Sequence, residues 1–515
     1  MTQRKALYGS TAVFIAMTGV AEADVTAREV WDNMSSFYAA AGYEIEPGAV
    51  TEASGTVTVS GLAINFPNPY ADLQDEVEID IDIEIADIVL TEMGDGTVEV
   101  AVPDTYALVV SVAPDGDDEG RFGMTIDQTG MSILASGEPD LVTYTIAAPR
   151  VAATLDTIEV PDASITNEEI NAVIGIDNVA GTYTVGSGDA STLAMNLTAD
   201  GTDFTVAAQE PGGGNGRFDM NIAYSGITWA STANIAQGDK PGDMTSMLRA
   251  GMTSSTELTH AGGGYSVDFM DDSDSFAMNG LAGSGAASIA MDAEGLSYRL
   301  SNTDMTLNVS GSEIPLPEVA IAAAGTAFGV TMPVLASETE QDIGLTVRLE
   351  GLSVSDMIWG MIDPAGELPR DPANVILELA GKGNWFLDIM DPTATAEFSG
   401  GMPGDVKSMD INELEVSVVG ASLTGTGGFT FNMEDFSTFA PFPAATGVVD
   451  LQLDGANALI DKLISMGLLP SEQAMGARMM MGLFARPGDG PDSLVSRIEL
   501  DGESGAISAN GQRLR

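Results

Sequence analysis

The chain of 515 residues contains no cysteine and a single histidine, His260. The absence of cysteine excludes disulfides, thiolate nucleophiles and cysteine-ligated metals. One histidine cannot form a multi-histidine metal site, and any triad would have to use it. His260 lies in a glycine-rich stretch, which favours an exposed loop residue. The G-x-S-x-G nucleophile elbow is missing too, so the sequence offers no starting point for a triad hydrolase.

Basic residues are scarce. Nineteen Lys and Arg oppose 76 Asp and Glu, which gives a net charge of −57 at pH 7. Such a surface repels phosphate backbones, so nucleic acid is excluded as a partner. An acidic surface is most often that of a soluble protein adapted to salt, and specific cation binding is the alternative.

Long apolar runs are missing after the N-terminus. Arg4 and Lys5 precede an apolar stretch over residues 6–20, and Ala-Glu-Ala at 21–23 is a small-x-small cleavage site. This pattern predicts a secretory signal peptide over residues 1–23, because the stretch is short and polar for a membrane span. We therefore expect an exported, periplasmic protein with no stable membrane span after cleavage.

Strict alternation is the main structural signal, and it is clearest over residues 76–85. Period two indicates a β-strand with one buried and one solvated face. The carboxylates on the solvated face repel each other by about 0.6 kcal/mol per contact in water. Burial of each apolar side chain returns roughly 1.5–3 kcal/mol, so the strand is favoured. The apolar positions are Val77, Ile79, Ile81, Ile83 and Ile85.

Similar patterns recur along the chain, separated by turns rich in its 59 glycines. An N-terminal helix is expected after Thr26, with Val30, Trp31 and Met34 on its apolar stripe. Further strands are expected over residues 55–64, 97–102, 106–113 and 122–126. Further helices are expected over residues 243–252, 353–361, 456–466 and 471–484.

An internal repeat organises these strands. The pattern Gly-Arg-Phe-x-Met-x-Ile occurs at 120–126 and again at 216–222, a third copy at 303–311 keeps only the following segment, and residues 414–420 form a faint fourth. In each clear copy a strand ends near Ile126, Ile222 or Leu300, and a new alternation begins five residues later. An odd step reverses the facing of side chains, so we expect a turn or bulge at each of these points.

The expected fold is therefore mainly β: a long, curved, largely antiparallel sheet with repeats and a few helices. We divide the mature chain into a β-rich repeat-containing region, 24–345, and a C-terminal β region with a helical hairpin, 346–515. A proline-rich segment at 364–372 marks the change.

Several segments resemble known families. The proline-rich segment 363–373, the segments 377–381 and 388–392 and the Asn-Gly-Gln near the C-terminus are similar to secreted bacterial proteins grouped as domain of unknown function 2125. That family has no assigned chemistry, so no functional residue is implied. The last 70 or so residues resemble, more distantly, the end of AsmA-type envelope proteins. This resemblance implies a long curved sheet with an apolar groove linked to envelope lipids.

Two candidate sites remain in the sequence itself. Asp115, Asp117 and Glu119 match the first half of a calcium loop, but Ile126 stands where a bidentate glutamate is required. The site would be a weak calcium site, and a solvated hairpin tip is the simpler alternative. Among 27 methionines, Met466, Met479 and Met480 could line an adaptable apolar groove, although ordinary core packing is the alternative.

The sequence therefore predicts a non-enzymatic periplasmic protein without a required cofactor. It would bind a lipid or another hydrophobic molecule, or act as an envelope scaffold, along an apolar sheet face that includes Val77 to Ile85. The first alternative is an acidic, cation-dependent structural or surface protein without a ligand cavity. The second is a hydrolase that uses a pair of carboxylates.

Overall fold

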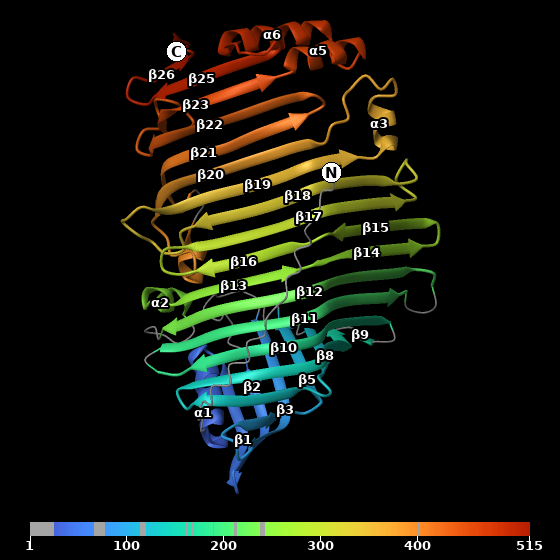
Figure 1. The fold of residues 1–515 in the computed structure, drawn as a ribbon, viewed down its shortest axis with the longest axis vertical. Coiled ribbons are helices and arrows are strands. Elements are labelled where there is room, and N and C mark those ends of the chain that lie inside the picture. The colour runs from blue at the N-terminus through green and yellow to red at the C-terminus, as the bar shows by residue number, and fades with distance from the viewer. Residues whose placement is uncertain are drawn as a thin grey trace, which may run out of the picture.

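One antiparallel sheet dominates the molecule (Figure 1). The computed structural model describes residues 25–65, 78–113, 120–160, 163–166, 169–188, 190–210, 214–236, 243–398 and 402–515. These residues form 27 strands and six helices, which confirms the expected mainly β fold. The proposed signal peptide, Val77 and the calcium-loop acids Asp115, Asp117 and Glu119 lie outside the described residues.

The elements have the following bounds. The helices are α1 Ala27–Ala40, α2 Met244–Arg249, α3 Asp356–Ile362, α4 Pro392–Glu397, α5 Ala456–Ser465 and α6 Ser471–Phe484. The first strands are β1 Glu44–Ala53, β2 Thr56–Asn65, β3 Glu78–Glu92, β4 Val98–Ala101, β5 Thr105–Ala113, β6 Gly120–Asp127, β7 Ser132–Glu138, β8 Leu141–Val160 and β9 Ala163–Thr166. The middle strands are β10 Ile170–Gly186, β11 Ala190–Gln209, β12 Arg217–Ala236, β13 Thr253–His260, β14 Gly262–Asp271, β15 Asp274–Ala282, β16 Gly285–Met291, β17 Leu296–Gly311 and β18 Val319–Met332. The last strands are β19 Gln341–Val354, β20 Ala373–Trp385, β21 Gly404–Val418, β22 Ala421–Asn432, β23 Ala444–Asp454, β24 Arg486–Pro487, β25 Ser493–Asp501, β26 Ala506–Ala509 and β27 Gln512–Arg513.

Helix α1 begins where the sequence predicts. The Thr26 hydroxyl accepts a hydrogen bond from the Glu29 amide, and the Glu29 carboxylate accepts one from the Thr26 amide at 2.9 Å. This capping box satisfies two amides that a helix start leaves unpaired. Val30 and Trp31 are buried on the side that packs against the sheet.

Most strands pair with the strands before and after them in the chain, and β17 to β23 follow one another in this way. Four long strands each pair with two short strands that lie end to end. β12 pairs with β13 and β14, and β17 pairs with β16 and β15. In the same way, β3 pairs with β4 and β5, and β8 pairs with β6 and β7.

The repeat marks the points where these long strands divide. Gly130, Gly226 and Asp304, each four residues after Ile126, Ile222 or Leu300, have positive φ angles of 79°, 59° and 48°. The expected turn or bulge is therefore confirmed in all three copies. β6 does end at this point, but β12 and β17 continue through it. In the faint fourth copy, Val419 and Gly420 instead lie at the turn between β21 and β22.

These residues belong to a longer line across the sheet, which we call the seam. In β8, β10, β11, β12, β17, β18 and β19 the side-chain alternation shifts by one residue at the seam, so apolar residues stay on one face. The seam is formed by Pro149, Asn178, Asp200, Gly226, Ala261, Asp304, Ala324 and Gly351. Asn178 Nδ2 donates to Asp200 Oδ2 across it at 2.9 Å.

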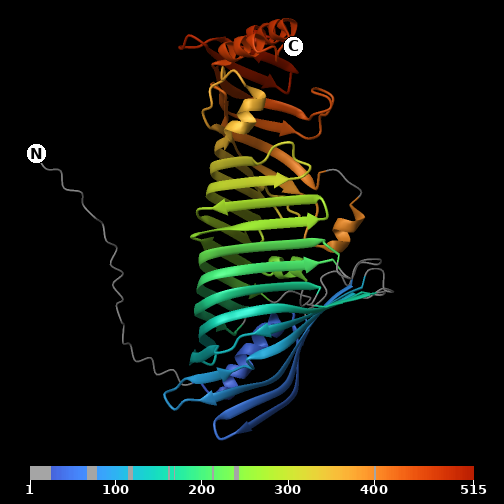
Figure 2. The ribbon, with the colours of Figure 1, turned by 90° about the vertical axis from the view of Figure 1, so that its right-hand side faces the viewer.

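The sheet is curved. A flat sheet would look thin when turned by 90°, but the strands that cross Figure 1 remain wide in Figure 2. The N-terminal strands curl around α1 (Figure 2). The main core lies there, where α1 covers residues of β2, β3, β4, β7, β8 and β10. A smaller core around Leu248, Val334 and Leu335 packs α2 against the ends of β16 and β17.

The proposed division near residue 345 falls inside β19, which is hydrogen-bonded to β18 on one side and β20 on the other. The ladder of strands therefore continues across that point.

Candidate apolar ligand-binding face

The side chains sort onto two chemically different faces of the sheet. We call the face that carries α1 the inner face, and Tyr144 and Val185 lie on it in contact with the α1 core. Strand register extends this face from β8 and β10 through the rest of the sheet. The opposite, outer face carries most of the Ser, Thr, Asn and charged residues of these strands.

One row of inner residues crosses nine strands without interruption, and we call it the central row. It consists of Leu197, Trp229, Leu258, Ala287, Leu300, Phe328, Val347, Leu377 and Leu414, each directly opposite the next. Neighbouring strands lie about 4.7–4.9 Å apart, so the row is about 38 Å long.

Three apolar residues of the central row are exposed, and the other six are half-buried. Trp229 is 41%, Leu300 39% and Phe328 44% exposed, and Ile289 on the adjacent row is 46% exposed. None of these four residues belongs to the two buried clusters of the described chain. Large apolar side chains exposed together on one face make that face a candidate interaction site.

The inner face also lacks charge. From β10 to β20, the described inward-facing positions carry no Asp, Glu, Lys or Arg apart from the hairpin tip at Asp271 and Asp274. Because an uncompensated charge is costly on a surface that meets hydrocarbon, this pattern suits an apolar partner.

Charges are instead paired on the outer face. Arg150 Nη1 bonds Asp177 at 2.7 Å and Asp203 at 2.8 Å. The hydrogen bond from Arg150 lowers the pKa of Asp203. Arg348 bonds Glu378, Glu350 and Glu413 on three adjacent strands, and its bonds to these carboxylates, first that to Glu378, raise its pKa. These pairs offset part of the repulsion of an acidic surface.

The predicted lining residues divide between the two ends of the sheet. Ile85 packs against the α1 core, and Ile81 and Ile83 are half-buried. Ile79 lies in β3, but its side chain is outside the described set, as is all of Val77. The acidic side of this strand includes Glu84, which is exposed.

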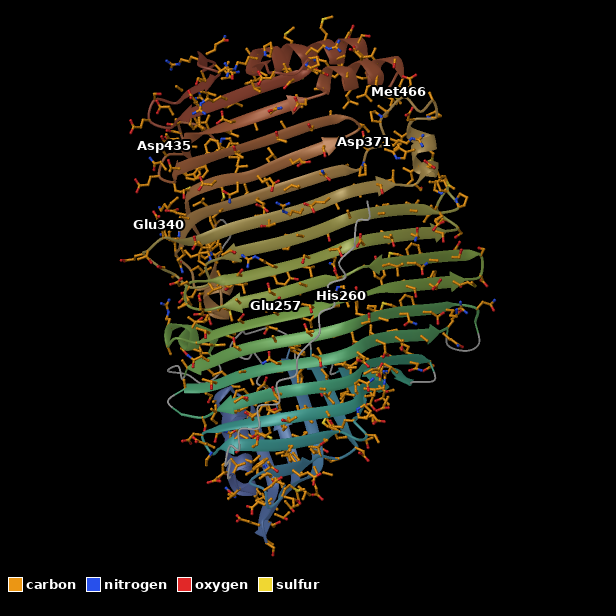
Figure 3. The ribbon with its side chains drawn as sticks, viewed as in Figure 1. Glu257, His260, Glu340, Asp371, Asp435 and Met466 are labelled. Atoms are coloured by element: carbon orange, nitrogen blue, oxygen red, sulfur yellow. The ribbon has the colours of Figure 1, made fainter. Side chains whose placement is uncertain are left out.

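The methionines lie at the other end, beside α5 and α6 (Figures 1 and 3). Met466 caps α5 and is half-buried, whereas Met479 is 71% and Met480 54% exposed on α6. The structure therefore does not bring the isoleucines of β3 and these methionines together. The inner residues between them were missed by the sequence predictions.

His260 is not an exposed loop residue, so that interpretation is wrong. It ends β13 near the middle of the sheet (Figure 3), half-buried, with Nε2 3.2 Å from Asn302 Oδ1. The two side chains meet above Gly285, where any Cβ would lie 2.3 Å from Nε2. The Tyr224 ring lies 4.6 Å away. These residues form a polar interruption of the inner face at the seam.

The described residues contain no cluster of three or more groups that could hold a metal ion. In the same residues, no helix combines the length and the hydrophobicity needed to cross a membrane. No family model, no curated protein and no solved structure matches the chain.

Proposed function

We propose that this chain is an exported, non-enzymatic protein that binds lipids or similar elongated hydrophobic molecules along its inner face. The observation that carries the proposal is the central row, whose apolar side chains are continuous across nine strands and include the exposed Trp229, Leu300 and Phe328. Covering such side chains with hydrocarbon is favourable by roughly 25 cal/mol for each Å² removed from water.

The dimensions favour acyl chains. The hydrocarbon core of a bilayer is about 30 Å thick, so one leaflet's chain spans about 15 Å. The central row, at about 38 Å, accommodates more than one such length end to end. From β10 to β20 the described inward-facing positions carry no charged side chain apart from Asp271 and Asp274, so a charged head group would lie at the sheet margins.

The curvature of the sheet (Figure 2) supports the same assignment. Curvature lets a bound chain contact residues on both sides of the seam, such as Ile174 and Trp229. The acidic outer face keeps the protein soluble and disfavours surfaces of anionic lipid.

The direct test is to purify the mature protein, extract it and identify co-purified molecules by mass spectrometry. Binding of a naphthalene-type apolar dye is then measured by fluorescence. We expect bound lipid and saturable dye binding. Leu300→Glu and Phe328→Glu should each weaken dye binding at least tenfold, because they place a carboxylate in the central row.

Ser301→Glu is the matched control, because it adds the same charge to β17 one residue away on the outer face, where Ser301 is exposed. It should leave dye binding unchanged. A protein that carries no lipid and binds dye equally in all four forms would exclude the inner face as a binding surface.

A further inference from the structure

A cavity of about 160 Å³ lies between α1 and the sheet. Its wall is almost entirely apolar and comes from α1 on one side and from β1, β2, β3, β4, β7, β8 and β10 on the other. The residues that matter most are Trp31, Met34, Ile64, Ile85, Tyr144 and Tyr183.

Two hydroxyls of this wall are already hydrogen-bonded to α1, and one of them is that of Ser35, which donates to the Asp32 carbonyl at 3.2 Å. The Tyr144 hydroxyl donates to two acceptors of α1, the Val30 carbonyl at 3.3 Å and Asn33 Oδ1 at 3.2 Å. None of the lining side chains is among the buried, unpaired polar groups of the described residues. Because water needs two to four polar partners, such a cavity favours hydrocarbon over water.

The wall of the cavity adjoins the inner face through Tyr183. Tyr183 lines the cavity, and in the sheet it lies directly opposite Met195 of β11, two residues from Leu197 of the central row. A chain lying along the inner face therefore meets the cavity as it approaches α1.

We propose that the cavity beneath α1 binds the terminal hydrocarbon segment of an acyl chain. This inference rests on the proposed function and adds the position at which the chain ends. An apolar cavity of about 150 Å³ can hold benzene, so about six carbon atoms fit. The cavity beneath α1 thereby limits the length of the acyl chain that the protein can bind.

The test uses two neutral probes: benzene, followed by ligand-observed NMR, and a series of 1-monoacylglycerols of increasing chain length. Ile85→Phe fills the cavity from the sheet side, and Met34→Phe fills it from the helix. Glu84→Gln, on the exposed side of the same strand, is the control. We expect wild-type protein and the control to bind benzene, and both filled variants to bind it at least tenfold more weakly.

In wild-type protein, affinity should rise about fourfold for each added methylene up to a limiting length. That limit should fall by about six carbons in the filled variants, while dye binding at the central row stays unchanged. Circular dichroism and melting temperature establish that each variant is folded. Two variants that fill the cavity from opposite walls keep the test valid if one fails to fold.

Equal benzene binding and an equal chain-length limit in wild-type and filled proteins would overturn the inference. Failure of the proposed function would give a different result. The central-row variants would then leave dye binding unchanged, even if benzene still binds in the cavity.

Discussion

Tyr144 and Tyr183 stack face to face beneath α1, with ring centroids 4.5 Å apart and planes 9° apart. Tyr144 is buried and Tyr183 is half-buried, and this burial raises the pKa of each phenol above its ordinary value of about 10. The pair therefore links the stability of the closed end of the sheet to alkaline pH.

We predict that the free energy of unfolding falls as pH rises above about 10. There the unfolded chain loses both phenolic protons while the folded protein keeps them, whereas below pH 10 both states hold them. Urea unfolding monitored by circular dichroism from pH 8 to 11.5 measures the slope. Tyr183→Phe should make it shallower, and a midpoint unchanged over this range in wild-type protein would contradict the prediction.

Gly226→Ala should destabilise the protein by about 2 kcal/mol, because Gly226 has a φ of 59° and its added Cβ would lie 2.7 Å from the Ala261 Cβ. Gly476→Ala is the matched control. Gly476 lies in α6 with open space around it, so alanine should stabilise by about 0.5–1 kcal/mol. Urea unfolding and amide exchange in β12 and β13 measure both effects. Equal effects of the two changes would show that the seam tolerates side chains.

Arg348→Gln should cost about 2 kcal/mol at low salt, because it leaves Glu350, Glu378 and Glu413 without their shared cation. Much of the loss should return in 1 M salt, where the Debye length is about 3 Å. Thermal unfolding at both salt concentrations measures this. Arg217→Gln, which removes an exposed pair with Asp219, should change stability by less than about 1 kcal/mol. A loss at Arg348 that is independent of salt would indicate packing instead.

We predict that the segment after α3 loses stability in acid because of Asp363. Its side chain has no exposed surface and accepts hydrogen bonds from the amides of Leu368 at 2.7 Å and Glu367 at 3.0 Å. These bonds, first that from Leu368, lower its pKa. The stabilisation is therefore present above about pH 4 and is lost as pH falls below it. Melting temperatures from pH 2 to 6 should decline less steeply in Asp363→Asn, and parallel curves would contradict this.

Local structure could be predicted well because its causes are local. Thr26 and Glu29 identify the start of α1, and alternation identifies β3. The odd step after Ile126, Ile222 and Leu300 locates the positive φ angles of Gly130, Gly226 and Asp304, since a shift in side-chain facing requires a change in backbone.

The candidate binding face could not be predicted in the same way. Trp229 and Phe328 lie on one row only because strand register aligns four intervening pairs. Alternation shows that each residue shares a face with its own strand neighbours, but not which residue of the next strand lies opposite. The exposure of that face depends in addition on which helices cover it, and α1 covers only the N-terminal end.

The nearest-neighbour pairing of β17 to β23 makes length an adjustable property of this architecture. Each of the strands β18 to β22 is hydrogen-bonded only to the strands before and after it, so gain or loss of one hairpin there would change the central row by two strand spacings, about 10 Å, and preserve the direction of the chain. The helix-covered N-terminal end would be unchanged. Duplication or deletion of a hairpin would thus lengthen or shorten the sheet without a change at either end.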